Sequence, residues 1–182
     1  VFSDSNGNAH ALGKVVAALQ RETFDNIVCL GDAIQGGPQP AECVALLRDL
    51  NAQVVMGNAD HFLLHGAEEG DDTPPERLKK QLAVREWQRS KLSGDDLRFI
   101  ETFQPTYEFR LDGMRTLLCF HGSPQSFDEV ILPTTPEATF QKYLAGHLPS
   151  ITCGGHTHMP QIRRIGASDS FFFNPGAVGF AY

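Results

Sequence analysis

Five short apolar stretches of the chain end in residues of the kinds that bind metal ions. In chain order they lead into Asp4 and Asn6, Asp32, Asn58, His121, and His156 with His158. Short apolar runs rich in β-branched side chains are typical of buried strands. In open α/β sheets, ligands bind outside the carboxyl ends of the strands, where such residues meet. We therefore expect these side chains to converge on one crevice.

Helical patterns separate the first three stretches. Apolar residues between positions 12 and 19 have the spacing of one helix face, and Pro40 begins a second helix. Strands that alternate with helices predict a sheet that is parallel in this half of the chain. Further strands are expected at 106–111, 114–120, 161–165 and 171–173, and a helix after Thr135. Asp112-Gly113 is a strong signal for a two-residue hairpin.

The segment 61–103 differs from the rest because it is highly charged and contains no convincing strand pattern. Residues 68–76 are acidic and include prolines, which favours an exposed loop, and 77–91 is compatible with a helix. Ser93 and Asp96 have the spacing of a capping box at the start of another helix. We interpret this segment as a helical insertion over the site, within a single domain of residues 1–182; an ordinary solvated helix pair is the alternative.

The composition favours one globular domain. The chain has 182 residues, 41% of them hydrophobic, which suffices for one core and is short for two. A net charge of −7 argues against a nucleic-acid polymer as partner, because such proteins usually carry a basic face. No apolar run approaches about 20 residues, so no membrane-spanning helix is expected. The four cysteines form no C-x-x-C pair, which favours buried free thiols in a reducing cytoplasm.

The stretch Gly154-Gly155-His156-Thr157-His158 is the most informative part of the chain. Two glycines allow a tight turn and a close approach of the backbone. In extended backbone, residues two apart point to the same side, so we expect both imidazoles to enter one space. Imidazole with carboxylate and amide oxygens suits Mn²⁺, Fe or Zn²⁺ better than Ca²⁺ or Mg²⁺. Two such ions roughly 3.5–4 Å apart are a recurrent arrangement for phosphoryl hydrolysis.

The ordered blocks resemble those of the calcineurin-like metallophosphoesterases. They read Asp4-Ser5-Asn6, Gly31-Asp32, Gly57-Asn58-Ala59-Asp60, His121-Gly122 and Gly155-His156-Thr157-His158. The pieces 121–124 (HGSP) and 174–179 (NPGAVG) are similar to the small bacterial and archaeal phosphodiesterase branch, described alongside diadenosine-tetraphosphatase-like proteins. The resemblance extends from Phe2 to Gly179. It implies a four-layer α/β/β/α sandwich with two metal ions at one sheet edge.

The resemblance also implies a role for each matching residue. Seven residues would hold two divalent ions: Asp4, Asn6, Asp32 and His158 the first, and Asp32, Asn58, His121 and His156 the second. A water or hydroxide between the ions would attack phosphorus in line with the leaving alkoxide, and the catalytic residues around it would be Asp32, Asn58 and His121. The expected cofactors are two Mn²⁺ ions, with Fe, Zn²⁺ and Ni²⁺ as alternatives.

Two positions depart from the family's pattern. Asn6 stands where a histidine is usual, and an amide oxygen holds Zn²⁺ or Fe less strongly than an imidazole. Ala59 stands where many members have a histidine that protonates the leaving group, although the small phosphodiesterase branch commonly lacks it too. His61 is a possible substitute acid; the alternative is an ordinary polar residue of the insertion.

Two functions follow from these observations. The first is a metal-dependent phosphodiesterase or phosphatase acting on a small phosphate ester or nucleotide. The alternative is a degenerate member that binds one metal ion and a phosphate ligand without useful turnover, which Asn6 and Ala59 keep open. We expect a small phosphorylated substrate, no nucleic-acid polymer and no membrane partner. No basic-then-apolar leader is present in this sequence, which favours a cytoplasmic location. The oligomeric state and the natural substrate stay open.

Overall fold

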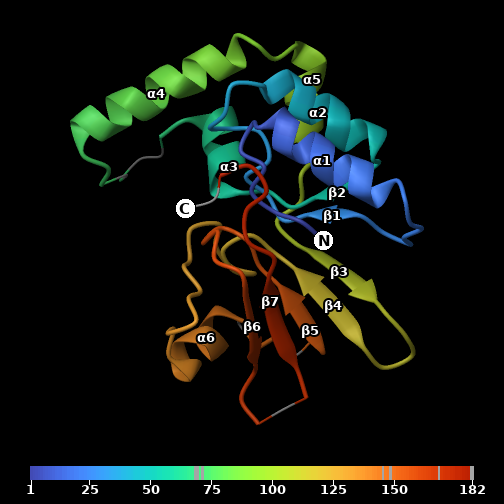
Figure 1. Cartoon of the computed structure of the whole chain (residues 1–182). Helices are drawn as coiled ribbons and strands as arrows, with labels where there is room; N and C mark the ends of the chain where they lie inside the picture. Colours follow the sequence, from blue (N-terminus) through green and yellow to red (C-terminus); the bar gives the residue numbers. More distant parts are fainter. Residues whose placement is uncertain (68–69, 71, 145, 148, 168, 181–182) are drawn as a thin grey trace.

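Three separate apolar clusters divide the computed structural model of this chain into four layers (Figure 1). The structure describes residues 1–67, 70, 72–144, 146–147, 149–167 and 169–180. One cluster lies between the N-terminal helices and a small sheet, the second between two sheets, and the third between the larger sheet and a single helix. The layers are therefore helix, sheet, sheet and helix, and the predicted α/β/β/α sandwich is confirmed.

The first helical layer contains α1 (Ala9–Leu19), α2 (Pro40–Asp49) and α5 (Gly94–Ile100). Buried residues such as Leu12 of α1 and Val44 of α2 pack toward the small sheet. The predicted capping box is present: the Ser93 hydroxyl accepts from the Asp96 N–H, and the Asp96 carboxylate accepts from the Ser93 N–H. The helix starts predicted at Pro40 and after Ser93 are therefore confirmed.

The small sheet pairs β1 (Val28–Cys29) with β2 (Gln53–Val54) in parallel, as predicted. It is extended on either side by single bridges, Phe2 with Cys29 and Val55 with Gln104. Side chains alternate along β1: Val28 belongs to the cluster between the sheets, and Cys29 to the cluster under the helices. Both faces are buried, which explains the continuous apolar runs in the sequence.

The larger sheet has the order β3-β4-β5-β7-β6. Its strands are β3 (Tyr107–Arg110), β4 (Thr116–Cys119), β5 (Ile151–Cys153), β6 (Gln161–Arg164) and β7 (Phe171–Asn174). The central three strands are parallel, and the edge strands β3 and β6 are antiparallel to their neighbours. The carboxyl ends of β4, β5 and β7 therefore lie side by side, next to the small sheet.

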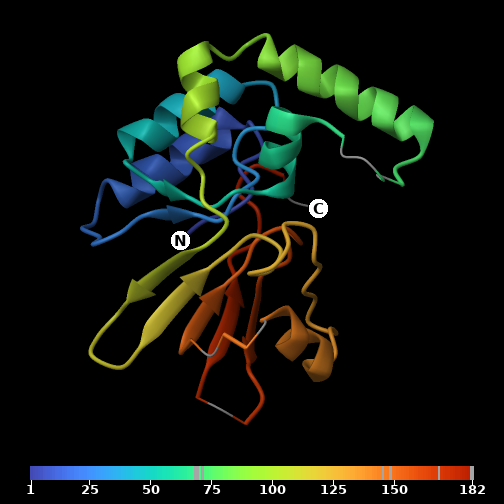
Figure 2. The ribbon, with the colours of Figure 1, turned by 180° about the vertical axis from the view of Figure 1, so that it is seen from behind.

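The helix α6 (Glu137–Tyr143) covers the outer face of the larger sheet, as Figure 2 shows from behind. Phe140 of α6 stacks edge-on against Phe172 of β7, with ring centroids 5.4 Å apart. None of the helices in the described ranges is long and apolar enough to cross a membrane.

The segment expected to be an insertion contains α4 (Pro75–Arg89), α5 and most of α3 (Asn58–His65), and no strand among its described residues. In both views α3 lies between α4 and the sheets (Figures 1 and 2). The helix α3 begins at Asn58, before the segment 61–103, and Gly57, which has extended backbone, serves as its N-cap. A predicted metal ligand is therefore the first residue of a helix.

The hairpin between β3 and β4 is present, but the prediction of a two-residue loop at Asp112-Gly113 is wrong. Arg110 pairs with Thr116, so five residues connect β3 to β4. The Leu111 N–H donates to the carbonyl oxygen of Arg115 across the turn, and the Asp112 carboxylate accepts further hydrogen bonds from the N–H groups of Met114 and Arg115.

Candidate metal centre

His121 follows the end of β4 and is fully buried. Its Nδ1 lies 2.7 Å from the carbonyl oxygen of Leu30, so Nδ1 carries the proton and donates it. Its Nε2 lies 3.1 Å from Oδ1 of Asn58 and 3.4 Å from Oδ1 of Asp32. Two oxygens and a ring nitrogen thus face one another at a point between the two sheets.

Asp32, His121 and His156 form the one group of three or more ionisable ligand types that converges in the described part of the chain. One ligand atom from each lies within 4.8 Å of the others. The imidazoles of His121 and His156 are 5.0 Å apart at their centroids and meet edge-on. With Asn58, this set is the one expected around the second ion.

Asp4 and His158 form a second pair beside this group. His158 Nε2 lies 3.2 Å from Oδ1 of Asp4. The other carboxylate oxygen of Asp4 accepts a hydrogen bond of 3.2 Å from the N–H of His156, which ties the two groups together. The two histidines of the GGHTH stretch therefore contact different partners, as expected for two neighbouring ion positions.

The backbone at these residues is not the extended backbone predicted from the sequence. Asp4, Asp32, His156 and His158 have φ angles of 55°, 47°, 65° and 57°. Residues other than glycine rarely adopt this left-handed conformation, and they retain it where the surrounding structure holds it. The two imidazoles are placed by this strained loop rather than by strand alternation.

Asn6 lies near this centre through its backbone. Its N–H donates to the carbonyl oxygen of Asp32 at 2.8 Å, and its φ is 47°. Its Nδ2 is buried and has no hydrogen-bond partner among the described residues. An amide nitrogen donates hydrogen bonds and does not bind cations, so Asn6 would ligate an ion through Oδ1.

The charges of the centre attract a cation. Burial lowers the pKa of His121, but the charge of Asp32 and a hydrogen bond to it outweigh burial and raise the pKa to about 9. Burial likewise disfavours ionised Asp32, yet the charge of His121 and its hydrogen bond hold the pKa of Asp32 below its ordinary value. The imidazole of His121 and the carboxylate of Asp32 therefore hold a proton tightly between them. The same nitrogen and oxygen atoms can bind a metal ion in place of the proton.

Two residues that support the centre were not given a role from the sequence. Asp60 is fully buried, and its carboxylate accepts hydrogen bonds from the N–H groups of Ala33 and Ile34, directly after Asp32. Burial and the charge of Asp32 raise the pKa of Asp60 to about 7. The signal for Asp60 was its place in the Gly57–Asp60 block.

Asn174, at the end of β7, is the second of these residues and supports the histidine loop. Its Nδ2 donates to the carbonyl oxygen of Gly155 and to Oγ1 of Thr157. A side chain at Gly155 would collide with the Ser3 hydroxyl, which explains the need for glycine there. The block 174–179 therefore holds the loop that carries both histidines.

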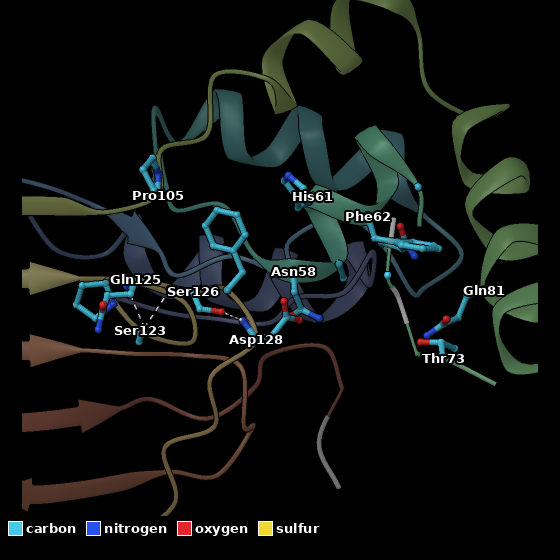
Figure 3. A pocket seen from close by; sticks show the side chains of 16 residues that line it. Asn58, His61, Phe62, Thr73, Gln81, Pro105, Ser123, Gln125, Ser126 and Asp128 are labelled. Atoms are coloured by element: carbon cyan, nitrogen blue, oxygen red, sulfur yellow. Dashed lines mark hydrogen bonds between the residues drawn. The ribbon is translucent and has the colours of Figure 1, made fainter. Parts of the chain in front are cut away.

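A cavity of about 710 Å³ adjoins the centre at Asn58 (Figure 3). His61 lines it, and its ring centroid lies 5.5 Å from that of Phe127 and 4.4 Å from that of His65. The possible acid is therefore beside the centre and is not a member of the ligand group.

Comparison with known proteins agrees with this geometry. Residues 1–182 match the calcineurin-like phosphoesterase superfamily domain. An uncharacterized protein of Methanocaldococcus jannaschii is 27% identical, over 98% of this chain and 75% of its own length.

Two solved structures show the same fold. A metallophosphoesterase from Sphaerobacter thermophilus has a TM-score of 0.71 and 25% identity, covering 99% of this chain and 76% of its own. A hypothetical protein from Pyrococcus horikoshii has a TM-score of 0.78 and 19% identity, covering 98% and 76%. The family match extends over the whole chain, and the chain therefore belongs to the calcineurin-like phosphoesterase superfamily.

Proposed function

We propose that this protein is a binuclear metal-dependent phosphoesterase that hydrolyses a small phosphate ester or nucleotide. The observation that carries the proposal is the convergence of Asp32, His121 and His156 within 4.8 Å, beside the Asp4–His158 pair. The likeness to a metallophosphoesterase at 25% identity supports it.

The side chains fit two divalent ions of intermediate softness. Asp4, Asn6, Asp32 and His158 would hold one ion, and Asp32, Asn58, His121 and His156 the other. Mixed imidazole and oxygen ligands suit Mn²⁺, Fe, Zn²⁺ or Ni²⁺, and Mn²⁺ is our first choice. When bound, such ions act as Lewis acids and lower the pKa of a bound water molecule to about 7.

The chain's own residues position the reacting groups. The Leu30 carbonyl fixes the tautomer and orientation of His121, so that Nε2 faces Asn58 and Asp32. The Ala59 N–H donates to Oδ1 of Asp32 at 2.8 Å and holds that carboxylate at the start of α3. We retain His61 as the proton donor to the leaving alkoxide, because it lines the cavity that begins at Asn58.

The test is the metal content of the purified protein together with hydrolysis of bis-p-nitrophenyl phosphate. We expect two ions per chain, turnover with added Mn²⁺, loss of turnover after chelation, and recovery when Mn²⁺ is returned. One ion or none, without turnover above background, would instead favour the alternative of a phosphate-binding protein in which Asn6 does not complete the first position.

A further inference from the structure

The cavity beside Asn58 has a composition that restricts what can bind in it. In Figure 3, Asn58 lies between His61 and Asp128, and Thr73 and Gln81 lie at the far end. The helix α3 forms one wall, and the loop 123–128 forms the opposite wall. A substrate whose phosphate is at the metal centre would extend its organic group into this space.

The cavity lining carries no lysine or arginine among the described residues. Among the described lining residues, Asp128 is the one with a carboxylate. The guanidinium group of Arg85 is near α3, but it donates to the carbonyl oxygens of Phe62 and Leu64. A second or third phosphate group would therefore meet no lysine or arginine among the described residues that line the cavity.

Gln35 offers an unsatisfied hydrogen bond to a ligand. Its side chain lines the cavity, and the residue is only 8% exposed. Its Oε1 is buried and has no hydrogen-bond partner among the described residues. Because buried polar atoms are almost always paired, an unpaired amide at a cavity wall points to a ligand with a complementary polar edge.

Aromatic side chains supply flat surfaces in the same cavity. Phe62 and Phe127 both line it, and Phe127 is held at 44° to the ring of His61. Planar rings stack on such surfaces. A planar, uncharged group with hydrogen-bond donors and acceptors on its edge combines the two requirements, and a nucleobase has these properties.

We propose that this cavity binds the nucleobase of a nucleoside monophosphate ester. The amide of Gln35 pairs with the edge of the base, and Phe127 packs against its face. The inference rests on the proposed phosphoesterase function for the position of the phosphate. It specifies one phosphate per substrate and disfavours dinucleoside polyphosphates, whose additional phosphates would meet no lysine or arginine among the described lining residues.

The first test is the binding of adenosine to metal-free protein by calorimetry, because a nucleoside without phosphate does not need the metal centre. We expect Gln35→Leu to weaken binding about tenfold or more, as the loss of a paired base contact does. Gln53→Leu is the matched control: Gln53 also has a buried, unpaired Oε1, but it lies at the start of β2 and away from the cavity. It should bind adenosine as the unaltered protein does.

Phe127→Leu provides a second, independent variant. Loss of one stacking surface should weaken adenosine binding by about five- to a hundredfold. This variant keeps the test decisive if Gln35→Leu does not fold, which circular dichroism will show. Absence of adenosine binding, or equal binding by the unaltered protein and both cavity variants, would overturn the inference.

The second test compares substrates of the Mn²⁺-loaded enzyme. We expect kcat/KM for the p-nitrophenyl ester of adenosine 5′-monophosphate to exceed that for bis-p-nitrophenyl phosphate, and Gln35→Leu to reduce the former by the larger factor. Diadenosine tetraphosphate should be the poorest of the three. Its preference over the monophosphate ester would overturn the inference, whereas failure to hydrolyse any of them would refute the proposed function and leave the adenosine binding result intact.

Discussion

The imidazole Nε2 of His121 lies 3.1 Å from Oδ1 of Asn58, although 63 residues separate the two in the chain. The contact joins the end of β4 in the larger sheet to the first residue of α3. Because Nδ1 of His121 is held by the Leu30 carbonyl, its ring cannot turn away without losing a buried hydrogen bond. The two side chains therefore form a preorganised half of the proposed second ion position.

Removal of the Asn58 side chain should disable this position. We expect Asn58→Ala to reduce Mn²⁺ affinity and kcat/KM by at least about 100-fold. Loss of a residue that only hydrogen-bonds to a metal ligand already reduces them by up to about 100-fold, and loss of a ligand itself should cost at least as much. Metal titration and bis-p-nitrophenyl phosphate hydrolysis measure the effect. The exposed Asn26→Ala is the control. Unchanged affinity in Asn58→Ala would remove Asn58 from the ligand set.

Asp60 gives a prediction about stability. Its carboxylate accepts from two buried backbone N–H groups, those of Ala33 and Ile34. We expect Asp60→Ala to lower the free energy of unfolding of the metal-free protein by about 2–4 kcal/mol, because each unpaired buried donor costs about 1–3 kcal/mol. Urea denaturation measures this. Asp49→Ala, an exposed aspartate at the end of α2, should change it by less than about 0.5 kcal/mol; equal losses in both variants would contradict the assignment.

The four layers were predicted through the resemblance of the ordered blocks, whereas the residue patterns themselves predicted buried strands and a parallel sheet in the first half of the chain. Val28 and Cys29 face different apolar clusters, so an uninterrupted apolar run is required there. The loop after β3 could not be predicted from Asp112-Gly113 alone. The carboxylate of Asp112 competes with the backbone for the turn's N–H groups, and dipeptide preferences do not include that contact.

The convergence of Asp32, His121 and His156 could also be predicted, since parallel strands bring their carboxyl ends together. Their geometry could not. His156 and His158 have left-handed backbone that is held by tertiary contacts, among them the Asn174 side chain on Gly155. Contacts between residues so distant in the chain have no local signal. The same holds for the cavity beside Asn58, which two distant segments form.

His61 and His65 allow a matched test of the proton donor. Both are on α3, but only His61 lines the cavity. We expect His61→Gln to reduce hydrolysis of diphenyl phosphate about 10²–10⁴-fold, because phenolate needs a proton to leave, and to affect bis-p-nitrophenyl phosphate far less. His65→Gln should change neither rate. A uniform loss on both substrates would mean that His61 supports structure or binding instead.

Two arginines of α4, Arg85 and Arg89, donate to carbonyl oxygens of the neighbouring helix α3. Arg85 donates to the carbonyl oxygens of Phe62 and Leu64 near the end of α3. Charged hydrogen bonds contribute about 1.5–3 kcal/mol each, so Arg85→Met should increase amide hydrogen exchange in α4 by about tenfold or more. The exposed Arg77→Met on the same helix is the control. Equal exchange in all three proteins would show that other contacts hold α4.

The buried thiols confirm the expectation of free cysteines, since Cys29, Cys43, Cys119 and Cys153 are all unpaired and buried. Burial, aided by the charge of Glu42, raises the pKa of the Cys43 thiol from 9.0 to about 12. The unfolded chain therefore releases this proton near pH 9 and the folded chain only near pH 12, so the contribution to stability is constant below pH 9 and is lost as the pH rises between these values. Between pH 8 and pH 10, the unaltered protein should lose about 1 kcal/mol more unfolding free energy than Cys43→Ala. Urea denaturation under reducing conditions measures both losses, and parallel pH profiles would show that the Cys43 thiol ionises freely in the folded protein.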